Sequence, residues 1–228
     1  MARVIGVGGN SERGLASDGQ TILKLTSGGV NSPLANILKS NAPALRIDQV
    51  IYFSWTGLPR DNDDPLDYKH NVWNGASLIE KSIGADADET IIVGWSNGGD
   101  TAFKLAKRLG ARGLKTVLMT LDPTSLLTRY HSWLTGFIAK PPGVELWVNA
   151  YPVSIHLAAI FDSEKPVFSE APIRSTVEGN VIAGFGGGWN WRSLADETYK
   201  FAGAHGETVK MLTYLTRKGG AFAKRYQT

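Results

Sequence analysis

One strand–turn–helix segment restricts the fold of this chain more than any other stretch. It spans Thr90–Ala106, with the sequence TIIVGWSNGGDTAFKLA. The β-branched run Ile91–Val93 is too short for a helix and predicts a buried strand. Apolar residues then recur at helical spacing from Thr101 to Leu109, which predicts a helix that ends at Gly110. A buried strand followed at once by a helix is typical of α/β proteins.

The turn between this strand and helix carries a serine flanked by glycines, Gly94-Trp95-Ser96-Asn97-Gly98. Because strand and helix pass close to such a turn, a Cβ two residues before or after the serine is expected to clash. The turn also places the serine at a helix N-terminus, where free N–H groups and the helix dipole favour negative charge. A glycine-rich connection with an incidental serine would give the same pattern, so the rest of the chain must supply a base and an orienting acid.

Further strands and helices alternate along the chain. Strands are predicted at Arg3–Val7, Gln49–Trp55, Lys115–Leu121 and Val144–Tyr151, with a short one within Asn180–Phe185; helices are predicted from Ser32-Pro33, over Tyr68–Ile83, and at the C-terminus through Val209, Leu212, Tyr214 and Leu215. This alternation predicts one α/β domain over residues 1–228, with a mostly parallel central sheet and helices on both faces. Segments 124–142 and 152–180 are predicted to be lid or insertion segments.

Composition excludes several classes of function. The chain has no cysteine, so it has no disulfide, thiolate metal site or cysteine nucleophile. Its net charge of +3 comes from scattered basic residues, which predicts no nucleic-acid groove. No apolar stretch reaches membrane-spanning length or forms a signal-peptide core, so we expect a cytoplasmic protein without stable membrane insertion. The sequence does not predict an oligomeric state.

Two motifs suggest ligands but fit them poorly. The acidic residues Asp61, Asp63 and Asp64 lack the glycine and distal glutamate of an EF-hand, so a solvated loop is expected and no metal is predicted. The glycines of Gly6–Gly9 suggest a dinucleotide fingerprint, but Ser11 replaces its third glycine and residues 12–29 lack a helical pattern. The backbone amides of this loop could instead face an oxyanion.

A serine nucleophile needs a general base, and the chain has four histidines. His70, His131 and His156 are expected on the surface or at caps. His205 lies in Gly203-Ala204-His205-Gly206-Glu207, a small-residue loop just before the final helix. Because flanking glycines let such a loop cross the edge of the sheet, His205 is the predicted base.

The orienting acid is predicted to be Asp122. It ends the strand that follows the serine strand, so its carboxylate is expected at the same edge of the sheet as Ser96. Pro123 stops the strand there. The alternative is an Asp-Pro turn whose side chain only caps local backbone. Asp162 and Asp196 are rival acids, each in a region with no clear preceding strand.

Together, strand–GWSNGG–helix, strand–LDP and GAHGE before a terminal helix resemble the α/β-hydrolase superfamily, in the order Ser, Asp, His. The position of Leu121-Asp122-Pro123 is most similar to the lipase-type variant. The resemblance implies Ser96 as nucleophile, His205 as base and Asp122 as its orienter, without a cofactor. It also implies an oxyanion hole from the N–H of Asn97 and one from the loop Gly8-Gly9-Asn10, with Gly9 and Asn10 as the candidates, although the His-Gly-Gly-Gly form of many esterases is absent.

The predicted function is therefore a serine hydrolase that cleaves a small-molecule or lipid-like carboxylic ester through an acyl-enzyme. Trp95, Trp189 and Trp191 are predicted to line its substrate site, although the tryptophans could equally serve ordinary packing. A thioesterase or acyltransferase on the same triad remains open. So does a binding protein that keeps the fold without turnover.

Overall fold

The computed structural model describes residues 1–9, 26–28, 32–53, 75–83, 89–95, 97–123, 140–152, 181–182, 189–190, 195–201 and 207–227. In this part of the chain, seven strands form one sheet in the order β2-β3-β1-β4-β5-β6-β9. They are β1 Ala2–Val7, β2 Thr26–Gly28, β3 Ile47–Phe53, β4 Glu89–Trp95, β5 Thr116–Leu121, β6 Val144–Pro152 and β9 Glu197–Phe201. The short strands β7 Val181–Ile182 and β8 Trp189–Asn190 pair antiparallel with each other.

The sheet is parallel apart from β2, which runs antiparallel to β3. Every residue of β1 and β5 is buried, as is all of β4 after its first residue. Strands covered on both faces need apolar side chains at successive positions, which explains their nearly continuous apolar runs. The predicted α/β architecture with a mostly parallel sheet is confirmed.

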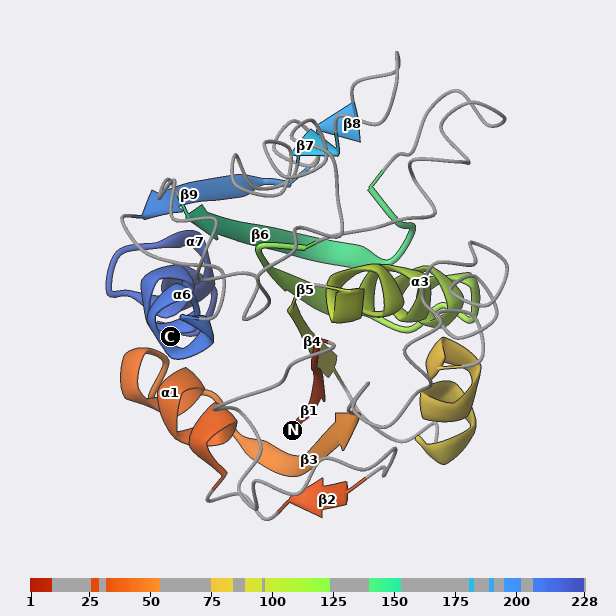
Figure 1. The fold of residues 1–228 in the computed structure, drawn as a ribbon. Helices are drawn as coiled ribbons and strands as arrows, with labels where there is room; N and C mark the ends of the chain where they lie inside the picture. The colour runs from red at the N-terminus through yellow and green to blue at the C-terminus, as the bar shows by residue number, and fades with distance from the viewer. Residues whose placement is uncertain are drawn as a thin grey trace, which may run out of the picture.

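Helices cover both faces of the sheet (Figure 1). One face packs against α1 Pro33–Asn41, α6 Thr208–Thr216 and α7 Ala221–Arg225; the other packs against α3 Asn97–Ala111 and the helical residues 75–82. Figure 1 shows α1 and α6 on one side of the sheet, and α3 with the yellow helix on the other. The two apolar clusters between these layers form the core.

The start of α1 follows the sequence prediction. Ser32 is the N-cap, and its Oγ accepts a hydrogen bond of 3.2 Å from the backbone N–H of Ala35. Pro33 takes the first helical position, where its missing N–H costs nothing. Leu34 and Leu38 are fully buried against the sheet.

The predicted end of α3 at Gly110 is wrong, since the helix continues to Ala111. A Cβ at Gly110 would collide with the backbone oxygen of Pro142, so this glycine permits a close approach of two segments. The left-handed residue that ends the helix is Gly113, with φ of 79°. Leu114 N donates to Leu109 O at 3.1 Å and Gly113 N donates to Gly110 O at 2.9 Å, the bond pair of a Schellman motif.

Three other differences concern elements and residues in both halves of the chain. The sequence analysis missed β2, β9 and α7. Trp189, for which no strand was predicted, lies in the strand β8. Val209 and Tyr214, expected on the apolar face of the last helix, are 45% and 42% exposed, whereas Met211, Leu212 and Leu215 are buried.

Several predictions fall outside the described residues. The proposed lid and insertion segments lie almost wholly in 124–139 and 153–180, and the first turns of the helix predicted over Tyr68–Ile83 lie before residue 75. Within the described ranges, none of the helices has the length and apolar character needed to span a membrane.

Candidate functional site

The strand order reverses direction at the centre of the sheet. From β1 the chain moves to β3 on one side, and later returns to β4 on the other side of β1. In open α/β sheets such a switch point opens a crevice beyond the carboxyl ends of the two strands, and ligands bind there. Gly8 and Gly9 follow β1 at this edge, and Ser96 follows β4.

The glycines around the serine are required by close packing. Strand β4 ends at Trp95 and α3 begins at Asn97, so Ser96 is the single residue that connects them. A Cβ at Gly94 would lie 2.5 Å from Ala102 Cβ and 2.6 Å from Gly98 O. A Cβ at Gly98 would overlap the backbone oxygens of Val7 and Gly8. The predicted clash two residues before and after the serine is confirmed.

Asp122 lies directly beyond β5, the neighbour of β4. Its backbone N–H donates to Ala150 O at 2.7 Å, which ties it to β6, and the residue is fully buried. It has φ of 39° and is the single non-glycine residue with positive φ in the described ranges. A Cβ at Gly99 would lie 2.5 Å from Pro123 Cβ, so the first turn of α3 also rests on the residue after Asp122. The ends of β1, β4 and β5 therefore meet around the start of α3.

Hydrogen bonding narrows the choice of amides for an oxyanion hole. Gly8 N–H donates to Phe53 O at 2.9 Å, so this amide is already used. The buried Gly9 has no hydrogen-bond partner for its N–H among the residues that the structure describes. Asn97 is the first residue of α3, and the first N–H groups of a helix lack acceptors within the helix.

The structure describes only some of the other predicted site residues. Ser96, His205, Asn10 and Trp191 lie outside the described residues, as do Asp162 and the remaining histidines. Trp95 is 4% exposed and belongs to the apolar cluster under α1 and α6. The backbone of Trp189 lies in β8.

The rival acid Asp196 has a structural contact. Its Oδ2 accepts from the backbone N–H of Trp147 at 2.8 Å and from Lys140 Nζ at 2.5 Å. It precedes β9 and lies level with the middle of β6, well before the carboxyl ends of the strands. Asp196 is therefore bound to backbone away from the edge that carries Asp122.

A buried polar chain beside Asp122 was missed by the sequence analysis. Trp147 Nε1 donates to Thr120 Oγ1 at 3.0 Å, and Thr120 Oγ1 donates to Asn149 Oδ1 at 2.7 Å. All three residues are fully buried. The signal in the sequence was a threonine and an asparagine within otherwise apolar strands, TVLMTL and VELWVNAYP.

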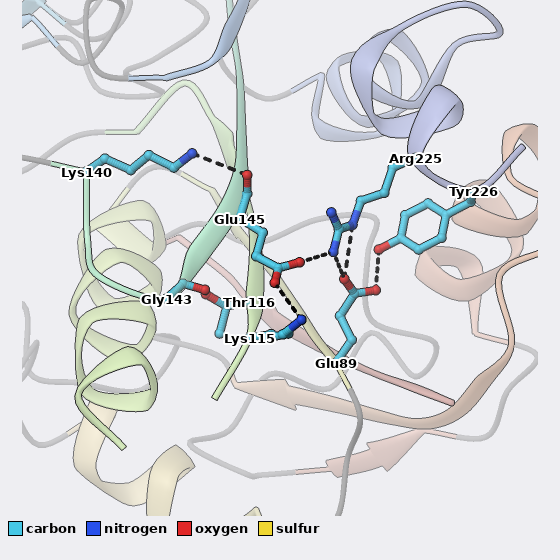
Figure 2. Close-up of polar contacts among 8 residues, drawn as sticks. All are labelled: Glu89, Lys115, Thr116, Lys140, Gly143, Glu145, Arg225 and Tyr226. Carbon is cyan, nitrogen blue, oxygen red and sulfur yellow. Dashed lines mark hydrogen bonds and ion pairs between the residues drawn. The ribbon is translucent and has the colours of Figure 1, made fainter. Parts of the chain in front are cut away.

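A second group of charged side chains lies at the opposite edge of the sheet. Figure 2 shows Arg225 between Glu89 and Glu145, at the amino ends of β4 and β6, with Tyr226 beside Glu89. These four side chains bind one another, which is typical of a structural cluster. Nowhere in the described ranges are three or more His, Cys, Asp or Glu side chains grouped to hold a metal ion.

The fold is of the α/β class, and the candidate site lies at its topological switch point, at the carboxyl ends of β1, β4 and β5. No family model matches the sequence, and no curated protein matches it. Among solved structures, the chain is similar to one titled "Putative hydrolase" from Agrobacterium vitis S4. The TM-score is 0.40 and the identity 15%, over 94% of this chain and 86% of that one. A likeness this remote carries no argument about activity.

Proposed function

We propose that the protein is a serine hydrolase that cleaves a carboxylic ester, with Ser96 as nucleophile, His205 as base and Asp122 as the acid that orients the base. The observation that carries the proposal is the convergence of three strand ends on the start of α3. Gly98 packs on the end of β1, Gly99 packs on Pro123, and the connection between β4 and α3 is Ser96 alone.

The chemistry follows from these positions. Ser96 Oγ attacks the ester carbonyl while His205 accepts its proton, and the carbonyl oxygen becomes an oxyanion. The N–H groups of Gly9 and Asn97 would donate to that oxygen. The alcohol then leaves with the proton from His205, and water, activated by the same histidine, releases the acid and restores the serine.

The number of residues between the end of β9 and His205 is large enough for His205 to reach Asp122. Strand β9 ends at Phe201 at the same edge of the sheet as Asp122, four residues before the histidine. Two strand spacings separate β9 from β5, about 10 Å. Four residues span at most about 14 Å, so His205 is within reach of Asp122. Helix α6, which follows, packs against β5, β6 and β9 and keeps the other end of the segment near this edge.

A fluorophosphonate probe tests the proposal directly, because it labels an activated serine covalently. We expect a single adduct at Ser96, located by mass spectrometry after digestion, that is lost in Ser96→Ala and strongly slowed in His205→Ala. His70→Ala serves as the matched control and should label at the wild-type rate.

The outcomes separate the competing functions. Absence of an adduct on the folded wild-type chain would support a binding protein without turnover. An adduct that forms equally fast in His205→Ala would reject the assigned base. Parallel assays with p-nitrophenyl esters and with acyl thioesters would then distinguish an esterase from a thioesterase on the same triad.

A further inference from the structure

The side-chain amide of Asn149 is buried with one end unused. Asn149 is fully buried on β6, and its Nδ2 has no hydrogen-bond partner among the residues that the structure describes. Burial of an amide donor without a partner costs about 1–3 kcal/mol. Trp147, two residues earlier on the same face of β6, packs in the apolar cluster, so this face of the strand accepts apolar residues. We therefore look for an acceptor near the Asn149 Nδ2 group.

The hydrogen-bond chain fixes which end of the amide is free. Trp147 Nε1 is a donor only, so Thr120 Oγ1 accepts from it. The one hydroxyl hydrogen of Thr120 then goes to Asn149, whose facing atom must be Oδ1. Nδ2, with both of its hydrogens, is therefore turned away from Thr120.

The position of Asn149 in the sheet points to Asp122 as that acceptor. Thr120 pairs with Asn149 in register, and Asp122 N–H bonds to Ala150 O. Asn149 is thus the diagonal neighbour of Asp122, about 8 Å away between backbones, a separation that two side chains and one water can bridge. Trp147 packs against Phe103 of α3 in a tilted arrangement, with ring centroids 5.6 Å apart, so Asn149, two residues later, shares the α3 face. Pro123 touches Gly99 on that same face.

We propose that Asn149 is a positioning residue for Asp122, with its Nδ2 donating to the Asp122 carboxylate through one bridging water. The inference rests on the proposed hydrolase function. A neutral amide donor favours the ionised carboxylate and fixes its orientation, and an oriented carboxylate in turn fixes the imidazole of the base. The Trp147–Thr120 pair would hold the amide in the correct rotamer.

Two variants of Asn149 test this role. Asn149→Leu removes the whole amide, and Asn149→Asp keeps the oxygen that accepts from Thr120 but replaces the donor. We expect both to slow fluorophosphonate labelling of Ser96 by about 10- to 100-fold. The unfolding midpoint of Asn149→Leu should change little, because removal of the unsatisfied Nδ2 offsets the loss of the acceptor for Thr120 Oγ1. Tyr52→Phe is the matched control: its hydroxyl is also buried and unpartnered within the described ranges, but lies on β3 away from Asp122. It should label at the wild-type rate.

A double-mutant cycle separates positioning from a general structural role. If Asn149 acts through Asp122, the Asn149→Leu change should alter the labelling rate less than twofold in an Asp122→Asn background. Equal slowing in both backgrounds, or an unchanged rate in Asn149→Leu alone, would overturn the positioning role while leaving the hydrolase proposal intact. Failure of the wild-type chain to label would instead remove the hydrolase proposal on which it rests.

Discussion

Asp122 combines two features that are each unfavourable for an acidic residue. It is fully buried, and its backbone has a left-handed φ of 39°. That conformation costs a non-glycine residue roughly 1–2 kcal/mol, although Asp and Asn tolerate it better than most side chains. A turn before Pro123 would form as well with glycine or asparagine.

Asp122→Asn should separate these two roles. Asparagine has the same shape and tolerates the left-handed conformation, so we expect the free energy of unfolding to change by less than about 1 kcal/mol. If Asp122 orients His205, labelling of Ser96 should fall by roughly 10³- to 10⁴-fold, as when the acid of a serine triad becomes an amide. Denaturant unfolding and labelling kinetics measure the two quantities. A large loss of stability with an unchanged labelling rate would show that the carboxylate only supports the turn.

At the scale of elements, the first turn of α3 is positioned by glycine contacts. Gly98→Ala places a methyl group on the backbone oxygens of Val7 and Gly8, neither of which can rotate away. We expect a loss of about 1–3 kcal/mol in stability and slower labelling of Ser96, because the helix start must move off β1. Gly113→Ala is the matched control at the far end of α3, where φ is 79° but nothing lies within 4 Å. It should lose about 1 kcal/mol and label normally.

Elements with continuous apolar runs were predictable from the sequence, and those stabilised by tertiary contacts were not. The strands β4, β5 and β6 follow directly from their buried residues. Strand β9, ETYKF, was missed because in its described side chains only Tyr199 is buried. Gly110 was misread as a helix end because close approach to Pro142 and a left-handed turn both select glycine.

The same limit applies to the candidate site. The position of Asp122 follows from the sequence because the end of a strand fixes the edge where its next residue lies. The occupied N–H of Gly8 depends on Phe53, and the unused donor of Asn149 depends on Thr120 and Trp147. Strand order and register decide which of these groups have hydrogen-bond partners. No local sequence pattern specifies either.

At the scale of the whole molecule, the C-terminal helix α7 is fastened to the amino ends of the strands (Figure 2). Arg225 bonds to Glu89 at 2.5 Å and also to Glu145, and Tyr226 donates to Glu89 at 2.5 Å. The hydrogen bond from Arg225, followed by that from Lys115, lowers the pKa of Glu145 below its ordinary 4.5. Burial, followed by the bond to Glu89, raises the pKa of Tyr226 above its ordinary 10.0.

These two shifts predict losses of stability at opposite ends of the pH range. The lowered pKa of Glu145 contributes stability above about pH 4.5 that is lost as the pH falls through the folded-state value. The raised pKa of Tyr226 contributes stability below about pH 10 that is lost as the pH rises through its folded-state value. Glu145→Gln should therefore flatten the acid limb of unfolding free energy against pH, and Tyr226→Phe the alkaline limb. If either limb keeps its wild-type slope in its variant, the corresponding assignment is wrong.

Arg225→Ala should weaken the whole cluster, since it leaves Glu89 and Glu145 without their shared cation. With the Arg225 side chain 30% exposed, solvent screening limits the expected loss to about 1–2 kcal/mol at pH 7 and low salt, and less at 1 M salt. Lys224→Ala, which removes a neighbouring exposed charge, should change stability by less than about 0.5 kcal/mol. Glu89 and Trp95 are separated by the length of β4, about 20 Å, so folded Arg225→Ala should label Ser96 at the wild-type rate. A slowed rate in the folded variant would mean that the two edges of the sheet are coupled, and that α7 acts on the site as well as on stability.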